Sequence, residues 1–256
     1  MTNQSPNHVT HFAAAPHPPI NLLAGRFEAL AAAGRCSTVG EVGHFLVGGE
    51  VYHLPRFVYR APDEHRPLRV GIFTGLRGNL EGGLALLQFL ENLEANPWRA
   101  AGYELWIYPL CNPTGHEDGG STNRRGVLLD HSFWKESAEP EVMLLERELA
   151  EQRFDAVITL YTDPRFDQFT GSAMGGTVAE RLLESGLAVA SATIGQPALE
   201  LPWPDGALSV QPRAGKPKVN LRFGVPRTIA MRPRVTALSV TLGGVLASAR
   251  HYLEAR

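Results

Sequence analysis

The 256-residue sequence is short of cysteine and of long apolar runs. Its two cysteines, Cys36 and Cys111, show no CxxC spacing and are too few for a disulfide framework, so both are expected to be buried thiols in a reducing compartment. No apolar run reaches about 18 residues, and we expect no membrane-spanning helix. The amino terminus has no basic segment followed by an apolar run, so no signal peptide is predicted and a cytoplasmic location is expected.

Net charge is also nearly absent, at −2 from 26 acidic and 24 basic residues. This balance gives no electrostatic reason to expect nucleic acid or an anionic membrane as a partner. The hydrophobic share of 44% and the charged share of 20% are typical of soluble globular proteins. The length is enough for one substantial core or two small domains. Composition gives no oligomeric state.

Apolar periodicity predicts helices and strands in alternation. A β-hairpin is expected around Gly48 and Gly49, with a third short strand behind it, and His44 and His53 beside it are interpreted as surface residues rather than ligands. Residues 111–138 form a long polar loop, a type that is usually functional. Strands are expected at 68–76, 103–110, 154–161, 187–194, 219–225 and 226–231, and helices at 20–35, 81–97, 139–152, 175–186 and 234–255.

This alternation predicts an α/β fold, a three-layer α/β/α sandwich with a mixed, mostly parallel central sheet. We expect residues 1–18 to be loosely ordered and 19–256 to form one domain, with 19–62 as a helix and hairpin extension. Ligands of such sheets bind beyond the carboxyl ends of the strands. Three loops leave those ends, at residues 75–83, 111–133 and 161–171.

Those loops carry three ordered motifs: "GLRGNLEGGLALLQFL", "YPLCNPTGHEDGGSTNRRGVLLDHSFW" and "DAVITLYTDP". In order and spacing they resemble the zinc carboxypeptidase superfamily, in its branch of succinylglutamate desuccinylases and aspartoacylases. The corresponding segments there read G-x-H-G-x-E, then N-P-x-G, R-x-N and G-V-D-L-N-R-x-F, then a strand that ends in D-x-H. The resemblance extends from about residue 68 to the end of the chain and implies the fold of that family.

The resemblance implies a zinc ion held by the His and Glu of the first segment and the His of the third. Those positions are Arg77, Leu80 and Tyr161 in this chain. Arginine does not lose its proton in proteins, leucine has no donor atom, and a phenol is an unusual zinc ligand. We therefore expect no metal and no other cofactor.

Other functional positions of the family differ as well. The substrate-binding Arg of R-x-N falls on Ser121, although its Asn is kept as Asn123. The Asn-Arg pair of the family falls on Asp130 and His131, and its late catalytic Glu falls on Ala230. The loss of so many groups together indicates a catalytically degenerate relative.

The favoured function is the binding of a small acidic or peptide-like ligand in the former active-site cleft. Arg77 is a candidate substitute for the zinc charge, paired with Glu81 or Asp163 and able to bind a carboxylate or phosphate. An internal salt bridge without a ligand is the alternative. The residues expected to line the cleft are Arg77, Glu81, Asn112, Asn123, Asp130, His131, Tyr161 and Asp163.

Two further interpretations stay open. One is an active hydrolase of amide bonds with a rebuilt site, with or without a bound metal; a metal there would be held by Glu81, His131 and Asp163. In that hydrolase His131 and Asp163 would serve as base and orienting group, and Tyr161 would stabilise a developing oxyanion. The other is a structural or assembly role with the cleft filled by side chains.

Overall fold

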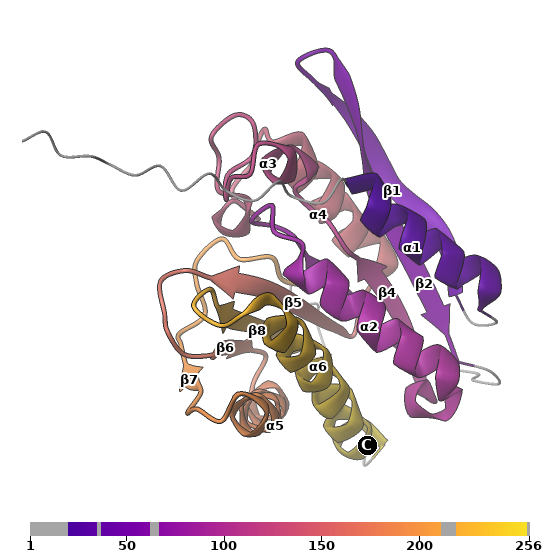
Figure 1. Ribbon diagram of the computed structural model, residues 1–256, viewed down its shortest axis with the longest axis vertical. Coiled ribbons are helices and arrows are strands. Elements are labelled where there is room, and N and C mark those ends of the chain that lie inside the picture. The colour runs from indigo at the N-terminus through magenta and orange to yellow at the C-terminus, as the bar shows by residue number, and fades with distance from the viewer. Residues whose placement is uncertain (1–19, 35–36, 62–66, 211–218, 255–256) are drawn as a thin grey trace, which may run out of the picture.

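The computed structural model describes residues 20–34, 37–61, 67–210 and 219–254 (Figure 1). Two predictions fall outside these residues: the buried thiol of Cys36 and the loose order of residues 1–18. The strands are β1 (Ser37–Val47), β2 (Glu50–Arg60), β3 (Leu68–Thr74), β4 (Tyr103–Tyr108), β5 (Ala156–Asp163), β6 (Thr170–Met174), β7 (Leu199–Glu200) and β8 (Val219–Pro226). The α-helices are α1 (Ile20–Ala33), α2 (Glu81–Ala95), α3 (Pro113–Glu117), α4 (Pro140–Gln152), α5 (Thr177–Ile194) and α6 (Met231–Glu254), and two 3₁₀ turns are η1 (Pro97–Ala100) and η2 (Leu129–His131).

All eight strands join one sheet in the order β1-β2-β4-β3-β5-β8-β6-β7. The central strands β4, β3, β5 and β8 are parallel to one another. The pairs β1–β2, β2–β4 and β8–β6 are antiparallel, and the short strand β7 is parallel to β6. The predicted α/β fold with a mixed, mostly parallel sheet is confirmed. From β3 the chain passes through α2 to β4, then crosses back through α4 to β5 on the other side of β3. The chain thus reverses its direction across the sheet at β3, and in such sheets ligands bind in a crevice beyond the carboxyl ends of the strands.

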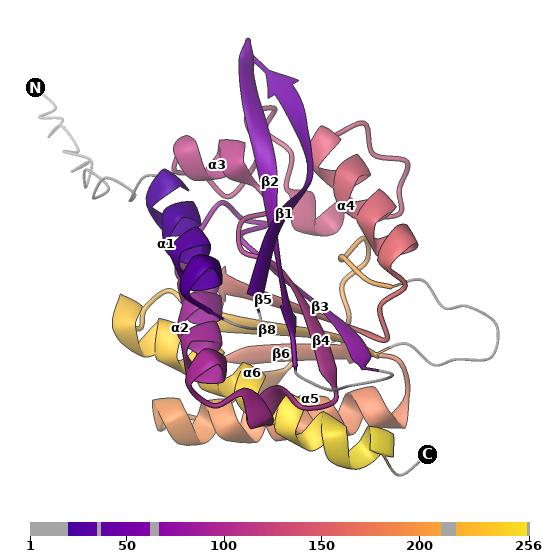
Figure 2. The same ribbon diagram turned by 90° about the vertical axis from the view of Figure 1, so that its right-hand side faces the viewer.

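Helices cover both faces of the sheet (Figures 1 and 2). On one face α1, α2, α5 and α6 pack on apolar side chains of the strands, including Ile72, Ile107 and Phe223. On the other face α4 packs on a smaller apolar group, in which the rings of Phe73 and Tyr108 stack 4.2 Å apart. Strands that are apolar on both sides fit only between two such layers. Among the described helices, none is long and apolar enough to cross a membrane.

The amino-terminal hairpin extends the sheet, because β2 pairs with both β1 and β4. The predicted third short strand is wrong, since β2 continues without a break through Pro55. Pro55 lies opposite Glu41, where β1 has a bulge, and outside the part of β2 that pairs with β4. A proline that has no ladder hydrogen bond to donate is tolerated at such a position.

The predicted strand at 187–194 is also wrong, because these residues form the second half of α5. Gly186 lies inside this helix, and a Cβ atom there would lie 2.5 Å from Cζ of Phe223. The glycine therefore lets the helix approach the sheet, and packing overrides the strand preference of a short apolar run. The helix ends at Gly195, which has a left-handed conformation with φ 73°.

Differences from prediction near the end of the chain bear on the site. Residues 226–231 were predicted to be a strand, but β8 ends at Pro226 and α6 begins at Met231, so that prediction is wrong. The short strand β6 was missed. The long loop at 111–138 contains α3 and η2 rather than irregular structure alone. Cys111, at its start, is buried as predicted.

Candidate functional site

A cleft of about 360 Å³ opens at the carboxyl ends of β3 and β5. This is the edge at which the sequence places the ligand site. The cleft is lined by Arg77, Gly78, Asn79, Leu80, Glu81, Gly119, Gly120, Ser121, Leu128, His131, Thr162, Pro164, Arg165, Arg227 and Met231. Its size lies near the lower end of the range for small-molecule sites, about 300–1,000 Å³.

The turn after β3 forms one wall of the cleft. Gly78 has φ 65°, and a Cβ atom there would lie 2.5 Å from the carbonyl oxygen of Gly120. The turn and the following loop are thus in direct backbone contact. This contact orients Arg77, which is only 8% exposed, toward the interior. Leu80 is buried and joins the apolar core against α2.

Arg77 pairs with two aspartates. Its Nε donates to Oδ2 of Asp130 at 2.7 Å, and its Nη1 lies 3.5 Å from Oδ1 of Asp163. Its guanidinium carbon lies 5.0 Å from the centre of the Tyr161 ring. Asp130 comes from η2 and Asp163 from the end of β5, and both are fully buried. Ion pairs therefore hold the two loops and the strand end together.

A second arginine, Arg222 on β8, completes this group. Its Nη2 donates to Oδ2 of Asp130 at 3.2 Å, and its guanidinium carbon lies 4.8 Å from the centre of the Tyr161 ring. Arg222 is 2% exposed, and its Nε and Nη1 have no hydrogen-bond partner among the described residues. Oδ1 of Asp130 also has none there. We call Arg77, Asp130, Asp163 and Arg222 the arginine–aspartate cluster.

Arg165 connects the cluster to the cleft. Its Nε and Nη2 donate to the two carboxylate oxygens of Asp163 at 2.9 and 2.8 Å. Burial raises the pKa of Asp163, but the hydrogen bonds from Arg165 and the charges of Arg77 and Arg165 outweigh burial and hold that pKa below its usual value. Asp163 is therefore a carboxylate at neutral pH. The side chain of Arg165 remains exposed on the cleft wall.

Two predicted site residues lie on the rim. Oε1 of Glu81 lies 2.8 Å from Nη1 of Arg234 at the start of α6, so Glu81 pairs with that arginine instead of Arg77. His131 has a partly exposed side chain, and its Nε2 lies 3.8 Å from Oδ1 of Asp130. Arg77, Glu81 and His131 are thus the predicted cleft residues that line the open space. Asp130, Tyr161 and Asp163 form its buried floor.

The two predicted asparagines stabilise the long loop. Asn112 accepts a hydrogen bond from the backbone N–H of Gly115 and donates to the carbonyl of Leu76, so it caps α3 and ties it to the turn after β3. Asn123 accepts from the backbone N–H of Val127 and donates to Glu139. Both are buried. Their side chains shape the cleft through the loop backbone.

The alignment of Ala230 with a glutamate at a strand end needs correction, because Ala230 lies in the turn before α6. The last strand of the sheet is β8, and its one charged side chain is Arg222. Arg222, Arg165 and Arg227 were not among the site residues predicted from the sequence. The segment "VNLRFGV" carried a signal for Arg222. It reads as a buried strand with an arginine in the middle, and a buried charge requires a partner.

A metal needs several donor atoms close together. Within the part of the chain that the structure describes, one group of three His, Cys, Asp or Glu side chains has ligand atoms within 4.8 Å of one another, and it consists of Glu41, His44 and His53 on the hairpin. Glu81, His131 and Asp163 do not form such a group. Instead, Glu81 and Asp163 each pair with an arginine.

No family model and no curated protein sequence matches this chain. Solved structures do match it. A metallo-carboxypeptidase from Burkholderia cenocepacia has a TM-score of 0.74 at 13% identity, over 90% of this chain and 69% of that one. A candidate metallopeptidase from Shewanella denitrificans has a TM-score of 0.72 at 16% identity, over 93% and 98%. Bovine thrombin-activatable fibrinolysis inhibitor has a TM-score of 0.71 at 10% identity, over 92% and 98%.

These likenesses show a shared fold. The chain has the architecture of the zinc carboxypeptidase-like proteins, as the three sequence motifs predicted. Identities of 10–16% carry no activity from those proteins to this one.

Charge is unequal around the cleft. Five arginines, 77, 165, 222, 227 and 234, lie on its walls, floor or rim, against three carboxylates, Glu81, Asp130 and Asp163. Arg227 is exposed and makes no ion pair with the described residues. The arrangement can attract an anion and offer it guanidinium donors.

Proposed function

We propose that the protein binds a small anionic ligand, a carboxylate or a peptide-like acid, in a cleft whose zinc-ligand positions have been replaced. The observation that carries the proposal is the arginine–aspartate cluster beneath an open cleft. The cluster is internally paired, and further arginines line the space above it. The protein would thus be a catalytically degenerate relative of the metallopeptidases.

The residues at the inferred zinc positions do not fit zinc. Arg77 and Leu80 have no lone pair to donate, and the guanidinium carbons of Arg77 and Arg222 lie 5.0 and 4.8 Å from the Tyr161 ring. A divalent cation there would meet two buried positive charges and only the aspartates that already pair with them. Zinc would require both arginines to move and their three ion pairs with Asp130 and Asp163 to break.

The cleft above the cluster fits a small acid. Arg165 and Arg227 are exposed on its wall, and Arg77 reaches its floor. Guanidinium groups bind carboxylate and phosphate oxygens with directed, charge-assisted hydrogen bonds. Leu128 and Met231 add apolar surface for the rest of a peptide-like ligand. The volume of about 360 Å³ limits the ligand to the size of one or two amino acids.

A second candidate function is amide hydrolysis without the family's metal site. The observation that favours it is the position of His131, whose Nε2 lies 3.8 Å from Oδ1 of Asp130. The two atoms are too far apart for a hydrogen bond, but a small rotation of the imidazole would let Asp130 accept one and orient His131 as a general base. The carboxylate near His131 is that of Asp130 rather than that of Asp163, the orienting group suggested by the sequence.

The binding function can be tested with inorganic phosphate, succinate and an acetylated dipeptide with a free carboxyl terminus. Each is titrated calorimetrically into the full chain at constant ionic strength. We expect saturable binding of at least one, weakened about 10–100-fold by Arg227→Gln, because a charge-assisted hydrogen bond contributes about 1.5–3 kcal/mol. Arg181→Gln, an exposed arginine on α5, is the matched control and should leave binding unchanged.

Two results would contradict the proposal. One is the absence of saturable binding by all three compounds. The other is equal weakening by Arg227→Gln and Arg181→Gln, which would mean nonspecific charge attraction. Release of acetate from the acetylated dipeptide, abolished by His131→Gln, would support the hydrolase instead.

A further inference from the structure

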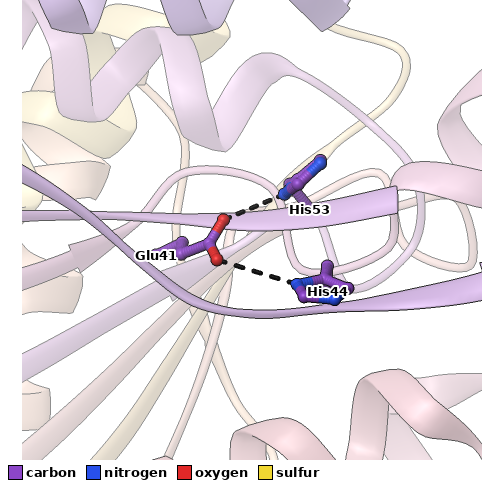
Figure 3. A group of neighbouring side chains, drawn as sticks. All are labelled: Glu41, His44 and His53. Atoms are coloured by element: carbon purple, nitrogen blue, oxygen red, sulfur yellow. Dashed lines mark hydrogen bonds and ion pairs between the residues drawn. The ribbon is translucent and has the colours of Figure 1, made fainter. Parts of the chain in front are cut away.

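A second group of chemically active side chains lies outside the cleft, on the hairpin of β1 and β2. We call Glu41, His44 and His53 the hairpin cluster. Figure 3 shows the carboxylate of Glu41 directed toward both imidazole rings, with one oxygen facing each ring. Oε2 of Glu41 lies 2.9 Å from Nδ1 of His53, and Oε1 lies 3.8 Å from Nδ1 of His44. The ring centres are 5.6 Å apart.

A β-bulge brings the three side chains to one face. His44 lies directly opposite His53, and Glu41 lies opposite Pro55, two residues along β2 from His53. In a regular strand, residues 41 and 44 would point to opposite faces. The register shifts between Glu41 and Gly43, and the extra residue restores both to the same face.

The bulge is fixed by packing. A Cβ atom on Gly43 would lie 2.9 Å from Cδ2 of Leu144 on α4, so the glycine lets that helix approach the bulged strand. Val42 and Phe45, the neighbours that point inward, belong to the apolar group under α4. The backbone that carries the cluster is therefore held on its inner side while its outer face is open.

The cluster has the donor atoms that zinc prefers. Two imidazoles and one carboxylate form a known set of three protein ligands, with a fourth position left for water or a substrate group. Tetrahedral zinc at bond lengths of about 2.0–2.2 Å needs donors about 3.3 Å apart. The candidate donors already lie within 4.8 Å of one another. Their side chains are 49–64% exposed, so small rotations suffice and the core need not change.

The surroundings favour a cation. Glu41 and His53 line a groove of about 670 Å³ between the hairpin and α1, together with Glu28, Glu50 and Glu117. Arg124 pairs with Glu50 and Glu117 and offsets part of this charge.

We propose that the hairpin cluster is a zinc-binding site, with Glu41, His44 and His53 as its protein ligands and an open position toward the groove. This site is independent of the cleft and of the proposed anion binding. Because it lies in solvent, zinc binding there orders side chains without burying charge.

The test is a zinc titration of the untagged full chain after removal of metal, by calorimetry and by metal content after dialysis. Loss of a residue that hydrogen-bonds to a metal ligand lowers metal affinity about 10–100-fold. Loss of a ligand itself should cost more, so we expect a larger decrease in zinc affinity for each of Glu41→Gln, His44→Asn and His53→Asn. Cobalt(II) provides a second measurement, because a protein site of this type gives visible absorption that the three variants should lose.

Controls separate this site from other histidines. His251→Asn, on the exposed end of α6, and a variant with His8, His11 and His17 changed to Asn should both keep the hairpin affinity. Circular dichroism of each hairpin variant checks that it remains folded. The proposal is overturned if the wild-type chain binds no zinc below about millimolar concentration, or if zinc binding survives all three hairpin substitutions.

Discussion

The cleft and the hairpin present ionisable side chains in opposite ways. In the cleft, Arg77 and Arg222 are buried with Asp130 and Asp163, so positive and negative groups neutralise one another. On the hairpin, the side chains of Glu41, His44 and His53 are exposed, and the cluster that they form contains no arginine or lysine. The ability to hold a metal therefore depends on the donor atoms and their existing partners rather than on the fold around them.

The largest difference between the two regions should appear in stability. Asp130→Ala leaves buried Arg222 without a carboxylate and Arg77 with only Asp163. Breaking a buried ion pair from one side should lower the free energy of unfolding by about 3–5 kcal/mol. Urea denaturation measures this loss.

The matched control for that change is Glu91→Ala, which removes the exposed pair of Arg26 and Glu91. We expect a loss below about 1 kcal/mol, as is usual for pairs in solvent. Equal losses in the two variants would mean that the arginine–aspartate cluster is not an energetic unit.

The next prediction concerns the turn that shapes the cleft. Gly78→Ala and Gly126→Ala both place a side chain at positive φ, and left-handed strain alone costs about 1–2 kcal/mol. Of the two glycines, Gly78 alone has backbone atoms within 3 Å of the added Cβ. Overpacking should therefore cost Gly78→Ala about 1–3 kcal/mol more. Thermal and urea unfolding compare the two. A smaller loss for Gly78→Ala would contradict the direct contact between the turn and the loop.

The pH dependence of stability should have opposite signs at two carboxyl groups. The folded pKa of Asp163 is lowered, so its contribution is full above the unfolded pKa of about 3.9 and is lost as pH falls through the folded pKa. The advantage of the wild type over Asp163→Asn should therefore shrink as pH falls below about 4. Urea unfolding at a series of pH values measures it.

Glu141 on α4 is the opposite case, because burial raises its pKa. Its contribution is full below the unfolded pKa of about 4.3 and is lost as pH rises through the folded pKa. As pH rises through the folded pKa of Glu141, the free energy of unfolding of the wild type should fall relative to that of Glu141→Gln. The stability difference between wild type and variant should therefore change with pH in opposite directions for Asp163 and Glu141. A change in the same direction would contradict the lowered pKa of Asp163 or the raised pKa of Glu141.

The smallest effect is expected on the hairpin without metal. His44→Asn should change the free energy of unfolding by less than about 0.5 kcal/mol, as do most surface substitutions. With free zinc at about 100 times its dissociation constant, the wild type should gain about 2.7 kcal/mol that the variant lacks. Thermal unfolding with and without zinc shows both. A large loss without metal would mean that the cluster is a structural ion pair.

Much of the fold could be predicted from the sequence, because long elements carry strong periodicity. The buried strands β3, β4, β5 and β8 and the helices α2, α4 and α6 lie close to their predicted places. The secondary-structure prediction failed where tertiary contacts determine which element forms. Gly186 suggested a helix end, yet it serves as the contact point between α5 and Phe223. Nothing local in "TGSAM" marked the short strand β6, which lies between β8 and β7.

The site was predicted in part. Arg77 was expected to pair with Glu81 or Asp163, and it lies near Asp163, whereas Glu81 pairs with Arg234. The arginine–aspartate cluster is assembled from four separate segments, so no motif could reveal the role of Arg222. The hairpin cluster depends on a bulge, and a regular strand would place Glu41 and His44 on opposite faces.

The most direct test of the contrast is crystallographic. Crystals grown with zinc chloride would be measured above and below the zinc absorption edge, and anomalous difference maps would locate the metal. We expect a peak bound by Glu41, His44 and His53 and none in the cleft. A peak in the cleft, bound by Glu81, His131 or Asp163, would contradict the account.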